Sequence, residues 1–299
     1  MVIHMKKRIF EGSCVALVTP FSADGSVNYD ELGRLVEFHI ENGTDCILSC
    51  GTTGEAATLS AEEHLGVMKF TIDKVAGRVP VIASTGSNDT AFSVYLSKEA
   101  EKMGADGLLL VTPYYNKTSQ KGLIESFFAV ADSVNIPCVV YNVPSRTGLN
   151  ILPETYLALS KHPNIVATKE ANHDISSVAK TISLCGEDLV VYSGEDSQTL
   201  PIMALGGKGI ISVFANILPR EMHDLAGAML EEDYSEARHL TSKYIELMDA
   251  LFADVNPIPV KEAMNLMGFD AGKPRLPLTD MTESGKAKLE SVMKKYGLI

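Results

Sequence analysis

Short apolar runs alternate along this chain with longer stretches in which apolar residues recur at helical spacing. Continuous apolar runs of this length are typical of parallel strands that are buried on both faces. They predict eight strands, at residues 12–18, 46–50, 79–84, 106–111, 137–141, 165–169, 189–193 and 209–213. A helical pattern follows each strand, for example at residues 29–41 and 90–103, and residues 142–148 are expected to form a loop.

The order of these elements predicts the fold class. Alternating strands and helices build parallel βαβ units. Eight such units in roughly 220 residues fit a closed (β/α)8 TIM barrel better than an open sheet. We therefore expect an α/β protein in which residues 1–232 form the barrel and carry the active site. Residues 233–299 have helical periodicity only, so we expect a C-terminal helical region of about three helices packed on the barrel.

Composition and net charge indicate which kinds of binding partner the chain can have. The chain has 299 residues, of which 45% are hydrophobic, with a formal net charge of −12 and an isoelectric point of about 5.1. An acidic chain without a Lys/Arg-rich run argues against nucleic acid and against an anionic membrane as partners. No apolar stretch reaches the roughly 18 residues that span a bilayer. A small anionic substrate remains compatible with this charge, because a few local cations suffice to bind it.

The cysteines and the N-terminus indicate a compartment. The five cysteines contain no Cys-x-x-Cys pair and are Cys14, Cys46, Cys50, Cys138 and Cys185. An odd number of cysteines in a long chain predicts reduced, mostly buried thiols. The first residues also lack the apolar core of a secretory signal. We therefore expect a cytoplasmic protein.

The stretch Pro163–Glu170 ends a predicted strand in a lysine, Lys169. A lysine in this position sits at the rim of an apolar core. Partial desolvation of its ammonium would lower the pKa and leave a nucleophilic amine, which forms a Schiff base with a carbonyl substrate. Taken alone, a lysine that simply returns the chain to solvent is the commoner explanation of this pattern, so the neighbouring strand ends decide its meaning.

In a barrel of this kind, chemistry is concentrated at the carboxyl ends of the strands. The residues that follow the predicted strands include hydroxyls, phenols and a cation: Thr52, Thr53, Tyr114, Tyr115, Tyr141, Arg146, Gly194, Glu195 and Asp196. No cluster of His, Asp and Glu suits a divalent metal. Three histidines, His64, His162 and His173, fall in helical or flanking segments, where solvated or capping roles are expected.

Imine formation requires proton transfers beside the lysine nitrogen. The phenol of Tyr141 can donate and accept a proton, and the hydroxyl of Thr53 can connect it to a second phenol. Arg146 can hold a substrate carboxylate in a bidentate fork. Each residue also has an ordinary structural explanation: a core aromatic for Tyr141, a turn hydroxyl for Thr53 and a surface loop for Arg146.

Five motifs together resemble one known family: the class I, lysine-dependent pyruvate aldolases of the dihydrodipicolinate synthase and N-acetylneuraminate lyase family. They are Gly-Thr-Thr-Gly-Glu at 51–55, Thr-Pro-Tyr-Tyr-Asn at 112–116, Tyr-Asn-Val-Pro-Ser-Arg-Thr-Gly at 141–148, Lys-Glu at 169–170 and Ser-Gly-Glu-Asp at 193–196. The likeness covers essentially the whole chain. Thr52 and Arg146 favour the synthase branch, because the sialic-acid lyases usually carry serine at the first position and lack the arginine.

The resemblance implies a reaction. Lys169 would form an imine with pyruvate, and the enamine would attack L-aspartate 4-semialdehyde. Its amine would then displace the lysine and close the ring of 4-hydroxy-tetrahydrodipicolinate, the first committed step of diaminopimelate and lysine synthesis. The family needs no metal or dissociable cofactor. It implies a homotetramer, a dimer of dimers in which the tail helices join the dimers.

The resemblance also implies roles for individual residues. Tyr141, Thr53 and Tyr115 would form the proton relay, with Tyr115 supplied by a neighbouring subunit. Thr52 and Thr53 would receive the pyruvate carboxylate, and Arg146 the carboxylate of the semialdehyde. Main-chain groups of Gly194 and Ile211 would complete the substrate pocket.

The chain departs from the family where many synthases bind inhibitory lysine. At positions that usually carry serine, histidine and an acidic residue, it has Ala56, Ala61 and Phe92, whereas Asn88, His64 and Tyr114 remain. Loss of a carboxylate would leave the ammonium of a bound lysine without a partner, which costs affinity. We therefore expect weak inhibition by lysine or none.

Three other interpretations compete with this one. Another pyruvate aldolase of the same fold would act on a sugar acid, such as N-acetylneuraminate or a 2-keto-3-deoxy acid, and Arg146 speaks against it. A phosphate-binding barrel is suggested by the glycines of residues 206–209, but these precede the last strand and so lie at the wrong end. A non-catalytic binding protein is expected to have lost Lys169 or its tyrosines, which are all present.

Overall fold

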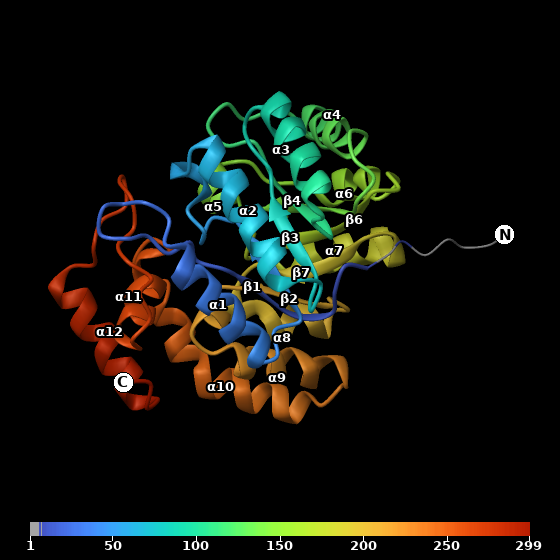
Figure 1. Cartoon of the computed structure of the whole chain (residues 1–299). Coiled ribbons are helices and arrows are strands. Elements are labelled where there is room, and N and C mark those ends of the chain that lie inside the picture. Colours follow the sequence, from blue (N-terminus) through green and yellow to red (C-terminus); the bar gives the residue numbers. More distant parts are fainter. Residues whose placement is uncertain (1–5, 7) are drawn as a thin grey trace.

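A closed parallel barrel forms the centre of the computed structural model, which describes residue 6 and residues 8–299 (Figure 1). Each strand pairs with the next in the chain, and β8 pairs with β1 to close the barrel. The predicted (β/α)8 TIM barrel is therefore confirmed. The strands are β1 Gly12–Ala16, β2 Cys46–Ser49, β3 Val81–Ser84, β4 Gly107–Val111, β5 Cys138–Asn142, β6 Ile165–Glu170, β7 Val190–Ser193 and β8 Gly209–Ser212.

Helices surround the barrel and extend beyond it. The barrel helices are α1 Tyr29–Glu41, α2 Ala61–Val75, α3 Thr90–Met103, α4 Gln120–Ala131, α5 Pro144–Thr147, α6 Pro153–Leu159, α7 Ile175–Cys185, α8 Thr199–Ala204 and α9 Pro219–Leu230. The tail adds α10 Tyr234–Ala250, α11 Ile258–Leu266 and α12 Glu283–Lys295, and short 3-10 turns are η1 Ala56–Thr58, η2 Gly186–Asp188, η3 Asp196–Gln198 and η4 Phe214–Asn216. No helix in the described part of the chain is both long and apolar enough to cross a membrane.

One expected loop was wrong. Residues 142–148 are not all loop, because α5 forms a single helical turn at Pro144–Thr147. Pro144 fits the first turn, where its missing N–H is not needed, and its fixed φ suits a helix. Gly148 ends the turn at φ 66°, a left-handed conformation that glycine adopts without strain. This turn carries Arg146.

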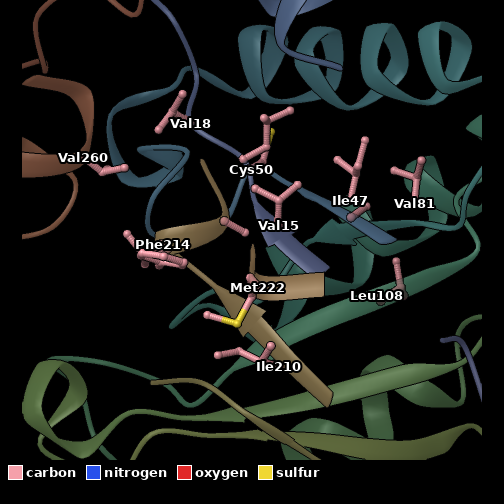
Figure 2. Packing of buried hydrophobic residues seen from close by; sticks show 14 of the residues in the cluster. Val15, Val18, Ile47, Cys50, Val81, Leu108, Ile210, Phe214, Met222 and Val260 are labelled. Carbon is pink, nitrogen blue, oxygen red and sulfur yellow. The ribbon is translucent and has the colours of Figure 1, made fainter. Parts of the chain in front are cut away.

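Two separate apolar layers hold the barrel. The inner layer fills the barrel with residues such as Cys14, Leu48 and Ile211, and at its amino-terminal end Phe10 stacks on Tyr192 with ring centroids 4.2 Å apart. The outer layer lies between the strands and the helices, and Figure 2 shows part of it: Val15, Ile47, Leu108, Ile210 and Met222. Side chains alternate across each strand, so neighbouring residues serve different layers.

The tail helices share the outer layer rather than enclosing a core of their own. Leu247 of α10, Met264 of α11 and Met293 of α12 belong to the same buried cluster as Val15 and Ile47 of the barrel. These helices lie to one side of the barrel in Figure 1. The tail is therefore packed on the barrel.

A buried ion pair fixes α11 to the loop after β2. Lys261 Nζ lies 2.8 Å from Glu55 Oε1, and both side chains are almost fully buried. The same ammonium donates to the Thr19 carbonyl, and the backbone N–H of Arg275 donates to Glu55 Oε2. Because further hydrogen bonds satisfy both charges, the pair can tolerate burial. It anchors the loop that carries Thr52 and Thr53.

Candidate active site

Tyr141 and Lys169 are direct neighbours on β5 and β6, where the two strands end. Both side chains belong to the inward-facing set, and they are only 6% and 5% exposed. Lys169 Nζ lies over the Tyr141 ring, 4.4 Å from its centroid. The barrel therefore brings an amine and a phenol together at its carboxyl-terminal end.

The environment of Lys169 favours the free amine. Burial lowers the pKa of Lys169 to about 8, which Cys14 and Asp196 oppose and the Arg146 cation reinforces. An ammonium removed from water loses hydration, so burial increases the fraction of the neutral amine at a given pH. About half of Lys169 is thus unprotonated at pH 8, and about a tenth at pH 7, and the free amine is able to attack a carbonyl.

Tyr141 keeps its proton. Burial raises the pKa of Tyr141 to about 12, although Arg146 and a hydrogen bond with the Thr52 side chain partly offset this. A protonated phenol beside the lysine nitrogen can donate to an oxygen that leaves as water and can accept a proton in return. The pair therefore contains the two groups that imine formation requires.

A cavity of about 300 Å³ opens above this pair. Arg146, Gly194 and Asn256 contribute to its wall. Its lining is Thr52, Thr53, Tyr141, Val143, Ser145, Arg146, Lys169, Ala171, His173, Gly194, Glu195, Val213, Phe252 and Asn256. Six of the eight residues expected from the sequence thus surround one cavity, while Tyr115 and Ile211 are not among its lining residues.

Gly194 allows the chain to pass close to the lysine. A Cβ at this position would lie 3.1 Å from Lys169 Cγ and 3.1 Å from the Glu170 carbonyl oxygen. The Gly194 N–H donates to that carbonyl at 2.8 Å. A side chain here would force Lys169 or the Glu170 backbone to shift by a few tenths of an ångström, so close packing explains the glycine. Ile211 is fully buried on β8 in the inner layer.

Tyr115 is the expected site residue that this chain does not bring to Lys169. It is 93% exposed and has a φ of 68°, in the loop after β4. A bulky residue in the left-handed region is an outlier that carries strain, and such strain clusters at functional positions. A role for Tyr115 in the relay therefore stays a prediction.

Asn256 connects two of the expected residues and was missed from the sequence. Its Nδ2 donates to Thr53 Oγ1 at 3.0 Å, and its carbonyl oxygen accepts from Arg146 Nη2 at 3.1 Å. The sequence suggested only that residues 256–259 interrupt the tail helices. These contacts link positions 203 and 110 residues apart, so no local spacing could reveal them.

A second polar cluster lies behind the amine–phenol pair and was also missed. Asn142 is paired with Glu170 in the strand register, and both face outward. Glu170 accepts from Asn142 Nδ2 at 3.0 Å and from the Tyr156 hydroxyl at 2.7 Å, and Thr168 Oγ1 donates to that hydroxyl at 3.1 Å. Burial raises the pKa of Glu170 to about 7, which the hydrogen bonds from Tyr156 and Asn142 oppose. In the sequence, only the Lys-Glu motif at residues 169–170 pointed to Glu170.

His64 and His162 are not solvated, because both side chains are buried. His64 is 6% exposed, and its Nε2 lies 2.8 Å from the Ser84 carbonyl oxygen. His162 is 8% exposed and contacts Asp132 Oδ1 at 3.0 Å, whereas His173 is exposed beside the cavity. Helix packing buries the first two rings, a tertiary effect that local sequence does not encode. Within residues 6 and 8–299, no group of three or more His, Cys, Asp or Glu side chains is placed to hold a metal ion.

A buried lysine of lowered pKa at the carboxyl end of a barrel strand, facing a phenol, defines a class of enzymes that bind a carbonyl substrate as an imine. The family is fixed by comparison with known proteins. This chain belongs to the dihydrodipicolinate synthetase family, whose model matches residues 9–296.

Individual relatives resemble the chain over nearly their whole length. It is 57% identical to a 4-hydroxy-tetrahydrodipicolinate synthase of Caldicellulosiruptor bescii, over 97% of this chain and 98% of the relative. A chloride-inhibited dihydrodipicolinate synthase of Acinetobacter baumannii, solved with pyruvate, is 43% identical with a TM-score of 0.96, covering 98% of this chain and 100% of that one. A dihydrodipicolinate synthase of Cyanidioschyzon merolae, solved with lysine bound, is 39% identical with a TM-score of 0.95, over 98% and 100%.

Proposed function

We propose that this chain catalyses the reaction of a 4-hydroxy-tetrahydrodipicolinate synthase, a lyase that condenses pyruvate with L-aspartate 4-semialdehyde. The product would be 4-hydroxy-tetrahydrodipicolinate, at the first committed step of diaminopimelate and lysine synthesis. The observation that carries the proposal is the contact of Lys169 with Tyr141 in a cavity that also contains Arg146. Family membership and the names of the relatives agree with this assignment.

The first half of the proposed reaction takes place at Lys169. Its free amine attacks C2 of pyruvate, Tyr141 protonates the departing oxygen, and water leaves as the imine forms. The Tyr141 phenolate then takes a proton from C3, which gives the enamine and restores the phenol. In this proposal Thr52 and Thr53 receive the pyruvate carboxylate, and the main chain of Gly194 and Ile211 completes the pocket.

The second half brings the acceptor aldehyde to the enamine. Arg146 would bind the carboxylate of the semialdehyde, since a guanidinium suits a carboxylate in a bidentate geometry. Asn256 holds Arg146 through its carbonyl and Thr53 through its amide, which fixes the two ends of the cavity relative to each other. The enamine carbon then attacks the aldehyde, and the substrate amine displaces Lys169 to close the ring.

A neighbouring subunit would complete the proton relay. We propose that Tyr115 enters the site of a second copy and joins Tyr141 and Thr53 there, in a homotetramer built as a dimer of dimers. Its 93% exposure and strained backbone in the single chain support this. We also propose the remaining sequence-based assignments: a boundary between barrel and tail at residues 232 and 233, and a cytoplasmic location.

A substrate panel tests the proposed function. The protein is incubated with pyruvate and either L-aspartate 4-semialdehyde or a sugar aldehyde such as N-acetylmannosamine, and products are weighed by mass spectrometry. We expect a product only from the semialdehyde, with the mass of both substrates less one water. A product from the sugar aldehyde alone would instead indicate the sugar-acid aldolase that Arg146 argues against.

We further propose that lysine inhibits this enzyme weakly or not at all. A cavity of about 370 Å³ is lined by Ala56, His64, Phe92 and Tyr114, but Ala61 and Asn88 are not among its lining residues. The acidic residue in its wall, Glu55, is already paired with Lys261. A lysine ammonium would therefore find no free carboxylate there, and an unpaired charge in such a site costs affinity. Substantial inhibition by about 1 mM lysine, roughly −4 kcal/mol of binding, would contradict this proposal.

A further inference from the structure

The cavity above Lys169 contains a carboxylate that takes no part in the steps assigned to Lys169, Tyr141 and Arg146. Among its lining residues, Lys169 and Arg146 are cations, and Glu195 is the one Asp or Glu. Glu195 is the second residue after β7, so it lies at the carboxyl end of the strand next to the one that carries Lys169. The amine, the guanidinium and this carboxylate thus share one space of about 300 Å³.

Glu195 differs from its neighbour Asp196 in what its carboxylate contacts. Asp196 is buried and accepts hydrogen bonds from Ser212 Oγ at 2.5 Å, from the Phe214 N–H at 3.0 Å and from the Val213 N–H at 3.2 Å. No hydrogen bond or ion pair engages the Glu195 carboxylate within the described residues. A partly buried carboxylate with free lone pairs in a substrate cavity is available to a ligand that donates protons.

We propose that Glu195 binds the ammonium group of the amino-aldehyde substrate and removes the proton that must leave before the ring can close. This inference rests on the proposed function, because it assigns the third polar group of the same substrate. Arg146 takes the carboxylate, the enamine on Lys169 takes the aldehyde, and Glu195 takes the ammonium. A substrate lacking the amino group would leave Glu195 without a partner.

The proton and bond changes balance without any further reactant. After the carbon–carbon bond has formed, the substrate ammonium gives one proton to the Glu195 carboxylate, and the resulting amine attacks C2 of the iminium on Lys169. A proton moves from the new ring nitrogen to the lysine nitrogen, the bond between C2 and Nζ breaks, and the ring carbon–nitrogen double bond forms. Lys169 leaves as a free amine, and the Glu195 proton passes to solvent.

The surroundings of Glu195 suit a base that works near neutral pH. The pKa of Glu195 is raised to about 7, chiefly by burial and also by the charges of Asp196 and Asp249 of α10, while Lys169 and Arg146 oppose the shift. The other titratable groups in the cavity wall are Tyr141 and the exposed His173, which contacts Gln198. A carboxylate whose pKa lies close to the working pH is a better proton acceptor than an ordinary glutamate.

Trapping with borohydride separates ring closure from the earlier steps. Wild type, Glu195→Gln and a control, Glu187→Gln, are each mixed with pyruvate, then with aspartate semialdehyde, reduced, and weighed by mass spectrometry. Glu187 lies before β7 at the opposite end of the barrel and pairs with Arg8. Glu187→Gln is therefore the same chemical substitution at a residue outside the cavity. A parallel set uses the four-carbon aldehyde acid that lacks the amino group.

We expect Glu195→Gln to trap pyruvate as wild type does, which also shows that the variant is folded. With aspartate semialdehyde it should accumulate a Lys169 adduct containing both substrates, and turnover should fall by about 10²-fold or more. With the desamino aldehyde, the variant and wild type should give the same adduct. Glu187→Gln should behave as wild type throughout.

Two outcomes would overturn the inference. Turnover of Glu195→Gln within about threefold of wild type, with only the pyruvate adduct trapped, would show that another group takes the proton. Loss of pyruvate trapping in this variant would place Glu195 at imine formation instead. Failure of the wild type to trap pyruvate or to consume the semialdehyde would count against the proposed function rather than against Glu195 alone.

Discussion

The inner and outer faces of β5 and β6 carry two polar pairs that differ in how many hydrogen bonds the protein makes to them. On the inner face, Tyr141 and Lys169 are neighbours whose polar ends open into a cavity. On the outer face, the next residues along, Asn142 and Glu170, are paired and enclosed in hydrogen bonds. The inner pair faces the cavity, where it can react with a substrate. The outer pair is hydrogen-bonded to other protein groups.

The difference shows how a reactive pair can be held in place. Strong hydrogen bonds from the protein to the Lys169 amine would occupy the group that reacts, whereas the Tyr141 phenol keeps a hydrogen bond with the Thr52 side chain of the same cavity. The outer pair ties the two strands together one residue further on, and Tyr156 and Asn150 extend the network. A shell of this kind is what holds a catalytic geometry within about 0.5 Å.

Replacing Tyr141 with Phe removes the phenol hydroxyl from the inner pair and leaves the outer pair intact. We expect turnover to fall by about 10²- to 10³-fold, since a positioned acid–base group contributes that much. Tyr192→Phe is the matched control, because Tyr192 also lies in the barrel interior but donates to the Phe10 carbonyl at the other end. Imine formation by Tyr141→Phe at the wild-type rate would remove Tyr141 from the mechanism.

The pH dependence of imine formation tests the state of Lys169. Because burial lowers the pKa of Lys169 to about 8, the free amine is lost as the pH falls below 8. We expect the rate of pyruvate adduct formation to fall about tenfold per pH unit below 8 and to level off above it. The measurement is a time course of borohydride trapping at fixed pyruvate. A rate that keeps rising to about pH 10.5 would indicate an ordinary exposed lysine.

Two substitutions at Glu170 test the outer pair. Glu170→Ala leaves Asn142 and the Tyr156 hydroxyl without their acceptor, so we expect a loss of about 1–3 kcal/mol in the free energy of unfolding. Because Lys169 would then be held less firmly in its reactive position, turnover should fall several-fold while the KM for pyruvate stays nearly unchanged. Chemical denaturation and steady-state kinetics measure the two effects. Unchanged kinetics would mean that the outer pair does not position the inner one.

Glu170→Gln separates charge from hydrogen bonding at the same site. Burial raises the pKa of Glu170 to about 7 from a usual value of 4.5, so the folded state holds its proton more tightly than the unfolded state does. The stability of the wild type should therefore fall as the pH rises from 4.5 to 7 through this group. The amide of the Glu170→Gln variant does not titrate, so the stability of this variant relative to wild type should rise over the same range. Chemical denaturation of both proteins across this pH range measures the difference, and a constant difference would contradict the raised pKa.

Most of the fold could be predicted from the sequence. Short continuous apolar runs mark strands buried on both faces, and helical spacing together with the cap residue Ser60 marks helices, so the barrel follows from local patterns. The turn α5 was missed because four residues are too few to set up a helical repeat. Burial of His64 and His162 was missed because it depends on which helices pack together.

Only part of the candidate site could be predicted in the same way. Residues that immediately follow strands, such as Lys169 and Tyr141, are found because strand ends meet at one rim. Asn256 reaches the same cavity from the tail, and nothing local in its sequence indicates a contact with Thr53 or Arg146. Glu195 was visible after its strand, but its freedom from partners became apparent only beside the fully bonded Asp196.

The most direct test of the central claim is to find which lysine binds pyruvate. The protein is incubated with pyruvate, reduced with borohydride, digested, and mapped by mass spectrometry, with Lys169→Ala as the control. The account predicts one pyruvate adduct per chain, located on Lys169 and absent from the variant. No adduct, or an adduct on another lysine, would contradict an imine mechanism at this site.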